Sequence, residues 1–231
     1  MNMALYAIGD LHLSLGTDKP MDKFGGVWVN YTEKIKNGFQ KITPDDVCIL
    51  CGDISWGMDL NESLNDFIFI NALPGRKIIL KGNHDYWWNT VTKINAFFQA
   101  NDIKNIDILH NNCYIYNETA ICGTRGWFTD DEISVQQNKK IMAREVLRLR
   151  TSLDTAKNAG EKICFFHYPP RFKNTVCDDI ISIMTEYGVK RCFYGHLHAD
   201  GHHYAVQGDV EGIEYNMISA DHISFTPQRI Y

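Results

Sequence analysis

The 231-residue sequence predicts an α/β fold in which two sets of strands pack together and helices lie outside them. Short apolar runs alternate with segments of helical periodicity, which is the pattern of such folds. Three short strand-like runs then follow one another in the middle of the chain and indicate a second set of strands. Because no repeat or low-complexity stretch divides the chain, one domain over residues 1–231 is expected.

The elements are predicted from apolar runs and from turn residues. Buried strands are expected at residues 4–8, 47–51, 77–80, 163–166 and 191–194. Helices are expected at about 30–40, 63–70, 90–100, 134–158 and 176–187, with Pro74-Gly75, Gly160 and Gly188 as stop signals. The runs 106–109, 113–116 and 119–123 are expected to be linked by hairpins through 111–112 and 117–118. Residues 203–219 are expected to form two antiparallel strands that turn at 208–209.

Composition limits the class of protein. A net charge of −5 gives no bulk attraction for nucleic acid or an anionic membrane. No apolar stretch approaches the roughly 20 residues of a membrane helix, and the first residues lack the features of a signal peptide. Cys48 and Cys51 have CxxC spacing, but residues three apart on a strand point to opposite faces, so reduced core thiols are favoured over a redox or zinc role. A cytoplasmic protein is expected.

All five predicted buried strands end in side chains that can bind a metal. Because ligands of such sheets bind beyond the carboxyl ends of the strands, these side chains are expected to converge. Seven oxygen and nitrogen donors are more than one ion needs, so the sequence predicts a two-metal site. The predicted ligands are Asp10, His12, Asp53, Asn83, His167, His196 and His198.

The donor types indicate the metal and the reaction. Asp10 and His12 lie two apart on an extended chain and are expected to project to one side, while Asp53 can bridge two ions. Nitrogen and oxygen donors without thiolate suit Mn, Fe, Zn or Co. Two divalent ions with two aspartates and a bridging hydroxide leave the centre near +1, which attracts an anion. Since metals lower the pKa of bound water from about 15.7 toward 7, phosphoester hydrolysis is inferred.

His84 is predicted to have a separate role. Its neighbour Asn83 faces the metal, so His84 is expected to face the substrate and to donate a proton to the leaving oxygen. Asp85 or Asp59 is expected to orient its imidazole.

Together, these motifs carry a family resemblance. Asp10-x-His12, Gly52-Asp53, Gly82-Asn83-His84-Asp85, His167 and Gly195-His196-x-His198 resemble the motifs of the calcineurin-like metallophosphoesterases. The resemblance implies a four-layer α/β/β/α sandwich of two mixed sheets with flanking helices. It also implies that Asp10, His12, Asp53 and His198 hold one metal, that Asp53, Asn83, His167 and His196 hold the other, and that His84 faces the leaving group.

Two departures favour a small substrate over a phosphoprotein. Ile54-Ser55-Trp56-Gly57 stands where the protein serine/threonine phosphatases have Asp-Arg-Gly, and Asp85 stands where they have Glu. The segment 123–127 is similar to one in bacterial-type members assigned only as phosphoesterases. Within it, Arg125 and Trp127 are candidate substrate-binding residues. Solvent exposure of Arg125, or an ion pair with Asp130 or Asp131, is the equally weighted alternative.

A metal-dependent hydrolase of phosphomonoesters, phosphodiesters or nucleotides is therefore the leading hypothesis. A metal-binding scaffold on the same fold and a nuclease are the alternatives, although the net charge argues against long nucleic acid as a partner. The expected partner is a small phosphorylated substrate or nucleotide, and no binding to a membrane is expected. Neither the substrate, the native metal nor the oligomeric state follows from the sequence. The loops at residues 14–29, 56–61 and 124–134 are expected to select the substrate.

Overall fold

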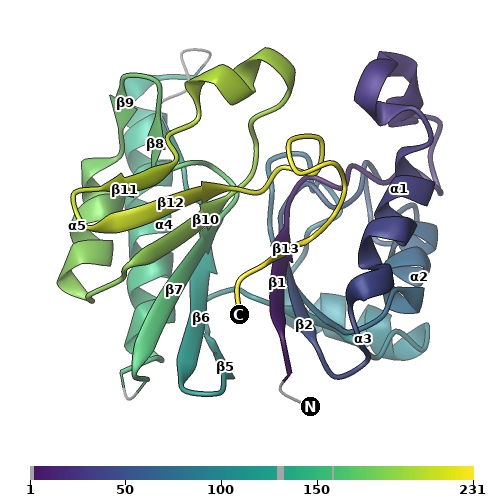
Figure 1. Ribbon diagram of the computed structural model, residues 1–231, viewed down its shortest axis with the longest axis horizontal. Coiled ribbons are helices and arrows are strands. Elements are labelled where there is room, and N and C mark those ends of the chain that lie inside the picture. The colour runs from purple at the N-terminus through teal and green to yellow at the C-terminus, as the bar shows by residue number, and fades with distance from the viewer. Residues whose placement is uncertain (1–2, 129–132, 158) are drawn as a thin grey trace. The chain divides into compact units, whose positions relative to one another are not determined.

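A computed structural model describes residues 3–128, 133–157 and 159–231 of the chain. These residues form two compact units, each built on one mixed sheet (Figure 1). Unit 1 contains Met1–Ile108 and Ile218–Tyr231, and unit 2 contains Leu109–Met217.

The sheet of unit 1 has the strand order β13-β1-β2-β3-β4. Four strands are parallel: β1 (Leu5–Ile8), β2 (Val47–Cys51), β3 (Arg76–Leu80) and β4 (Ile106–Ile108). The edge strand β13 (Gln228–Arg229) pairs antiparallel with β1. The helices are α1 (Tyr31–Gly38), α2 (Leu64–Ala72) and α3 (Val91–Ala100), with 3-10 turns at Met21–Phe24, Gly26–Trp28 and Phe39–Lys41. Parallel pairing requires crossovers, and these helices supply them.

One apolar cluster joins the three helices of unit 1 to its sheet. Alternate residues of the strands, such as Cys48 and Leu50 of β2, pack in this cluster with Ile35 of α1, Phe67 of α2 and Phe98 of α3. Each helix lies along the sheet because its apolar residues recur at helical spacing on the face that the sheet covers. As a result, the carboxyl ends of β1, β2 and β3 are held in register beside each other.

A buried carboxylate ties α2 to the loops after β1 and β2. Asp66 is fully buried and accepts hydrogen bonds from the backbone N–H of Leu15 at 2.7 Å and from the hydroxyl of Ser55 at 2.5 Å. Burial raises the pKa of Asp66 from 3.8 to about 6, although both hydrogen bonds oppose the shift. This residue therefore anchors both loops at their bases.

The sheet of unit 2 has the strand order β11-β12-β10-β7-β6-β5. Its parallel strands are β6 (Thr119–Thr124), β7 (Glu161–Phe166), β10 (Arg191–Tyr194) and β12 (Ile213–Met217). The edges β5 (Tyr114–Tyr116) and β11 (Gly208–Val210) pair antiparallel with their neighbours. Other elements are α4 (Val135–Asp154), α5 (Asp178–Glu186), the hairpin β8 (Arg171–Phe172) with β9 (Thr175–Val176), and a 3-10 segment at Ala199–Tyr204.

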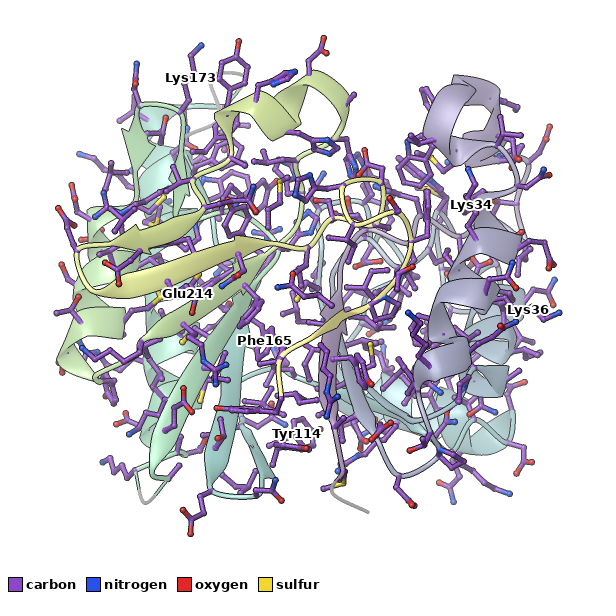
Figure 2. All side chains as sticks on the ribbon, viewed as in Figure 1. Lys34, Lys36, Tyr114, Phe165, Lys173 and Glu214 are labelled. Atoms are coloured by element: carbon purple, nitrogen blue, oxygen red, sulfur yellow. The ribbon has the colours of Figure 1, made fainter. Side chains whose placement is uncertain are left out.

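A separate apolar cluster forms the core of unit 2. Leu149 and Leu153 of α4 and Ile180 and Met184 of α5 pack in this cluster with alternate strand residues, such as Cys164. From β7, Phe165 stacks on Phe193 of the neighbouring strand β10, with ring centroids 5.3 Å apart (Figure 2 labels Phe165). The parallel pairing of β7 and β10 ends both strands at one edge of the sheet.

The predicted fold class is confirmed, because the chain forms two mixed sheets with flanking helices. All five predicted buried strands form, with ends close to the predicted bounds. Within the described residues, no helix combines the length and the apolar character needed to cross a membrane. All seven cysteines lie in the described residues and are free, and burial raises the pKa of the Cys164 and Cys192 thiols.

Three local predictions were wrong. Residues 111–112 do not close a hairpin, because β4 and β5 belong to different sheets. The last hairpin turns at Glu211-Gly212, whose φ values of 56° and 82° suit a two-residue turn, whereas residues 208–209 lie in β11. The fifth helix starts at Asp178, because Val176 pairs in β9.

The buried Asp66 predicts a specific pH dependence of stability. Because its folded-state pKa exceeds the unfolded value, the native state binds the extra proton between pH 3.8 and about 6. The contribution of Asp66 to the free energy of unfolding should therefore fall by at most about 3 kcal/mol as the pH rises through this window. Urea unfolding of the wild type and Asp66→Asn across this range should give profiles that diverge with pH. Parallel profiles would contradict the assignment.

Candidate metal centre

In unit 1, the loops after β1 and β2 hold three predicted ligands in an unusual backbone conformation. Asp10, His12 and Asp53 have φ values of 59°, 46° and 49°. Asp and His are among the residues that adopt the left-handed region most readily, but the conformation still costs energy. An extended chain at Asp10 and His12 was predicted from the sequence. The structure shows left-handed backbone at both residues instead, so this prediction was wrong. Hydrogen bonds from Asp10 N to Gly52 O at 3.0 Å and from His12 N to Asp53 O at 2.9 Å join the two loops.

These three side chains meet. Ligand atoms of Asp10 lie within 4.8 Å of those of His12 and Asp53, and His12 Nε2 lies 3.6 Å from Asp53 Oδ2. All three are buried, with at most 3% of any residue exposed. Two carboxylates this close together in a buried site repel each other unless a cation compensates them. The donor set and its burial therefore fit a metal ion.

The carboxylate of Asp53 is held in place by the loop after β3. Asp53 Oδ1 accepts a hydrogen bond from the backbone N–H of His84 at 2.8 Å. A Cβ atom at Gly82 would lie 2.1 Å from the same Oδ1, so only glycine leaves room for the carboxylate. Asn83, the predicted amide ligand, lies in this loop between the two residues. The Gly-Asn-His motif thus positions Asp53, and it also contains the predicted ligand Asn83 and the predicted acid His84.

His84 lies in an aromatic group beside these ligands. Its ring centroid is 5.8 Å from that of His12 and 4.5 Å from that of Trp56, and Trp56 also stacks on His12 at 5.0 Å and 22°. The hydroxyl of Tyr86 lies 3.4 Å from Nδ1 of His84. His84 is half-buried, so part of this residue is open to solvent beside Asp53.

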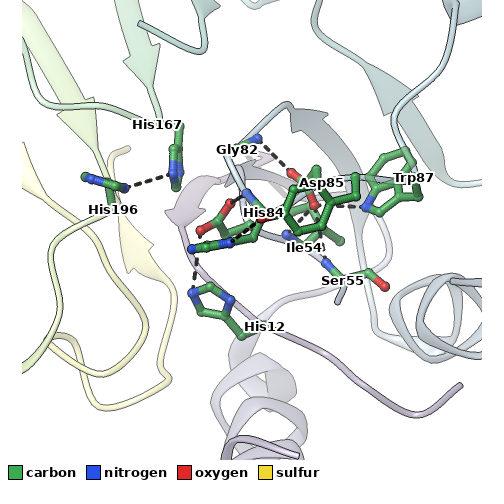
Figure 3. Close-up of polar contacts among 11 residues, drawn as sticks. His12, Ile54, Ser55, Gly82, His84, Asp85, Trp87, His167 and His196 are labelled. Carbon is green, nitrogen blue, oxygen red and sulfur yellow. Dashed lines mark hydrogen bonds and ion pairs between the residues drawn. The ribbon is translucent and has the colours of Figure 1, made fainter. Parts of the chain in front are cut away.

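Asp85 is fully buried and binds the backbone around the site. Its carboxylate accepts hydrogen bonds from Gly82 N at 2.7 Å, Ile54 N at 2.8 Å, Ser55 N at 3.3 Å and Trp87 Nε1 at 2.9 Å (Figure 3). Burial raises the pKa of this carboxyl, against the effect of the four donors. These contacts position the loops after β2 and β3. The role of Asp85 in orienting the His84 ring stays a prediction.

In unit 2, two predicted ligands also meet. His167 follows β7 and His196 follows β10, and Nε2 of His167 lies 3.2 Å from Nδ1 of His196. His167 is fully buried, whereas His196 is half-buried and has a φ of 73°. The backbone N–H of Gly195 donates to His167 O at 3.2 Å and joins the two loops. Two imidazoles at this distance share one proton or accept a metal ion between them.

His198 has a neighbour, His202, that was not among the predicted ligands. Ligand atoms of His198 and His202 lie within 4.8 Å of each other. His202 ends no apolar run and was therefore not among the predicted ligands. The 3-10 segment that begins after His198 brings the two rings together, and their spacing of four residues was the available signal.

Arg125 and Trp127 lie in the loop after β6, and Arg125 reaches α4. The guanidinium of Arg125 is 3.6 Å from the buried Glu145 of α4, which also pairs with Arg148 at 2.5 Å and accepts from the hydroxyl of Thr124 at 2.5 Å. The alternative partners Asp130 and Asp131 lie outside the described residues. Arg125 also lies over the ring of Trp127, at 5.0 Å.

Trp127 itself is buried. Only 9% of the residue is exposed, and its indole N–H donates to Asn138 Oδ1 at 2.9 Å. Its ring packs edge-on against Tyr168, whose own ring lies 4.3 Å from that of His196. Trp127 thus supports the histidine loops by packing, and its contact with a substrate stays a prediction.

Residues 3–200 match the model of a family described as calcineurin-like phosphoesterase. The chain belongs to this family. The match includes all five motifs and every predicted ligand from Asp10 to His198, and it confirms the resemblance that these motifs carry. A comparison with curated proteins gives no match.

Several solved structures are similar to the chain. The phosphopantetheinyl hydrolase of Mycobacterium tuberculosis is 13% identical, with a TM-score of 0.61 over 99% of this chain and 96% of that one. The protein of unknown function AQ665 from Aquifex aeolicus is 16% identical, with a TM-score of 0.49 over 99% and 96%. TT1561 of Thermus thermophilus is 10% identical, with a TM-score of 0.47 over 86% and 83%. The similarity to the mycobacterial structure supports the fold alone.

Replacing Asp85 with Asn should destabilise the protein. One amide oxygen cannot accept all four hydrogen bonds, so at least one buried N–H group is left without an acceptor. The free energy of unfolding is expected to fall by about 2–4 kcal/mol. Urea unfolding checks this, with the exposed Asp102→Asn as the matched control, expected within about 0.5 kcal/mol of the wild type. Equal stability of the two variants would remove Asp85 from its positioning role.

Proposed function

We propose that this phosphoesterase uses two metal ions to hydrolyse a phosphomonoester, a phosphodiester or a nucleotide. The observation that carries the proposal is the buried group of Asp10, His12 and Asp53 with the ring of His84 beside it. A scaffold that only contacts proteins has no need of a half-buried histidine next to paired carboxylates. Membership in the family supports the same reaction class.

The family's pattern assigns the ligands. In this proposal, Asp10, His12, Asp53 and His198 hold one ion, and Asp53, Asn83, His167 and His196 hold the other. The oxygens of Asp53 support its place in both sets, because Oδ2 faces His12 while Oδ1 is oriented by the loop that carries Asn83. The donors suit Mn, Fe, Zn or Co. When bound, such a pair lowers the pKa of water and stabilises charge on the phosphoryl oxygens.

His84 is proposed as the general acid. During hydrolysis a water oxygen bonds to phosphorus, the bond from phosphorus to the leaving oxygen breaks, and His84 donates a proton to that oxygen. Trp56 and His12 pack against the ring of His84, and its backbone N–H is bound to Asp53. These contacts hold the proposed acid in one position beside the predicted ligands. They limit motion of the His84 ring, which would otherwise lower the rate of hydrolysis.

The proposed partner is a small phosphorylated molecule rather than a long nucleic acid or a membrane. The net charge of −5 supports this choice, because long polyanions need extended basic surfaces. The seven free cysteines support a reducing compartment, and we therefore propose the cytoplasm.

Two variants test the reaction. With p-nitrophenyl phosphate and bis-p-nitrophenyl phosphate, activity should require Mn²⁺ or a related ion and stop with chelator. Asp53→Asn should lose bound metal and activity together. His84→Asn should keep its metal content while kcat falls by about 10²–10⁴-fold, and the exposed His203→Asn is the matched control that should stay active. A fully active His84→Asn variant would remove His84 as the acid.

Arg125 can be tested against an arginine that shares its partner. If Arg125 binds the phosphoryl group, Arg125→Ala should lower kcat/KM by about tenfold or more with metal content unchanged. Arg148→Ala removes the other arginine that pairs with Glu145, and it should leave the kinetics near those of the wild type. Equal losses in both variants would mean that Arg125 acts through Glu145. Unaltered kinetics in both would exclude Arg125 from the site.

A further inference from the structure

Unit 1 contains a cavity next to the aromatic group of the site. It has a volume of about 240 Å³, and the residues that line it include Lys19, Met21, Lys23, Phe24 and Trp56. The first four belong to the loop after β1, and Trp56 belongs to the loop after β2. A larger cavity of about 540 Å³ in unit 2, by the β5–β6 turn, includes none of the predicted site residues.

Trp56 connects this cavity to the chemistry. The same indole that forms a wall of the cavity contacts the rings of His12 at 5.0 Å and His84 at 4.5 Å. His84 is the proposed acid and therefore marks the side on which the leaving group departs. A leaving group bound in front of His84 can extend from this ring over Trp56 and into the cavity.

The apolar part of the wall indicates an apolar occupant. Met21 and Phe24 contribute apolar surface beside the indole of Trp56. Phe24 is 74% exposed, so its ring is accessible to a ligand in the cavity. A flat, apolar group between Phe24 and Trp56 would remove this surface from water.

The charged part of the wall indicates an anionic substituent. Lys19 places its ammonium 5.9 Å from the centre of the Trp56 ring and 3.9 Å from the sulfur of Met58. Asp18, which also lines the cavity, lies 3.9 Å from the ammonium of Lys23. Among the ion pairs of the described residues, none includes Lys19. The cavity thus combines apolar walls with a lysine that can pair with an anion.

We infer that this cavity binds the leaving group of the phosphoester, and that the preferred leaving group has an apolar, flat body and a further anionic substituent. The body would lie between Trp56 and Phe24, and the anion would pair with Lys19. The inference rests on the proposed function, because it uses His84 to identify the leaving side. It narrows the substrate to phosphoesters of bulky alcohols that carry an anionic substituent, rather than of small neutral alcohols.

The test combines hydrolysis with binding. In the hydrolysis assay, kcat/KM is measured for phenyl phosphate and naphthyl phosphate. The leaving alcohols of these two esters have similar acidity but differ in apolar area. Wild-type protein should prefer the naphthyl ester, and Phe24→Ala should reduce this preference by about fivefold. Binding of naphthol sulfonate, measured by calorimetry, should weaken by about fivefold in both Phe24→Ala and Lys19→Met. The binding measurement needs no turnover.

Matched controls come from exposed residues that do not line the cavity. Leu147→Ala on α4 removes a similarly exposed apolar side chain, and Lys36→Met on α1 removes an exposed lysine. Both should keep the wild-type preference and affinity. Naphthol sulfonate that binds all variants alike, or not at all, would overturn the cavity assignment even if hydrolysis is observed. Selective binding without hydrolysis of any phosphoester would overturn the proposed function while the binding site remains.

Discussion

The position of the Asp53 carboxylate is the constraint on which the rest of the site depends. One oxygen accepts the backbone N–H of His84 and the other faces His12, so a single side chain fixes the loops after β1, β2 and β3 relative to each other. The absence of a side chain at Gly82 makes room for it. Moving this carboxylate would displace a predicted metal ligand and the proposed acid together. Three non-glycine residues, Asp10, His12 and Asp53, adopt left-handed backbone here in spite of its energetic cost.

Buried polar groups around Asp53 add a second level of constraint. Asp85 binds the backbone of both flanking loops, and Asp66 binds Ser55 and Leu15 from α2. Each is a fully buried carboxylate that is satisfied by several donors, and such groups are expensive to break even where their net contribution to stability is small. The aromatic and cationic loop that lines the cavity beside Trp56 starts from this same anchored base. The anchored loops that carry the predicted ligands therefore lie next to the loop that lines the cavity.

In unit 2 the pairing of two strands, and not a shared carboxylate, positions the predicted histidine ligands. His167 and His196 follow neighbouring parallel strands, so strand register brings the two loops together and the imidazoles lie 3.2 Å apart. Tyr168 packs on His196, and Trp127 packs on Tyr168, which places an apolar support behind the rings. Neutral imidazoles tolerate such packing better than carboxylates do, since their burial carries a smaller desolvation cost.

The sequence by itself determined the five buried strands, the fold class and the set of predicted ligands. Apolar runs of four to six residues that end in Asp, Asn or His carry this information locally, and parallel pairing then places their ends at one edge of each sheet. What only the tertiary structure decided were contacts between residues far apart in the chain. Asp85 binds the backbone of two loops, Arg125 pairs with Glu145, and Trp56 joins the proposed acid to a cavity. Periodicity reports which face of an element is buried, whereas the partner of a polar side chain depends on which other elements the fold brings within about 3 Å of it.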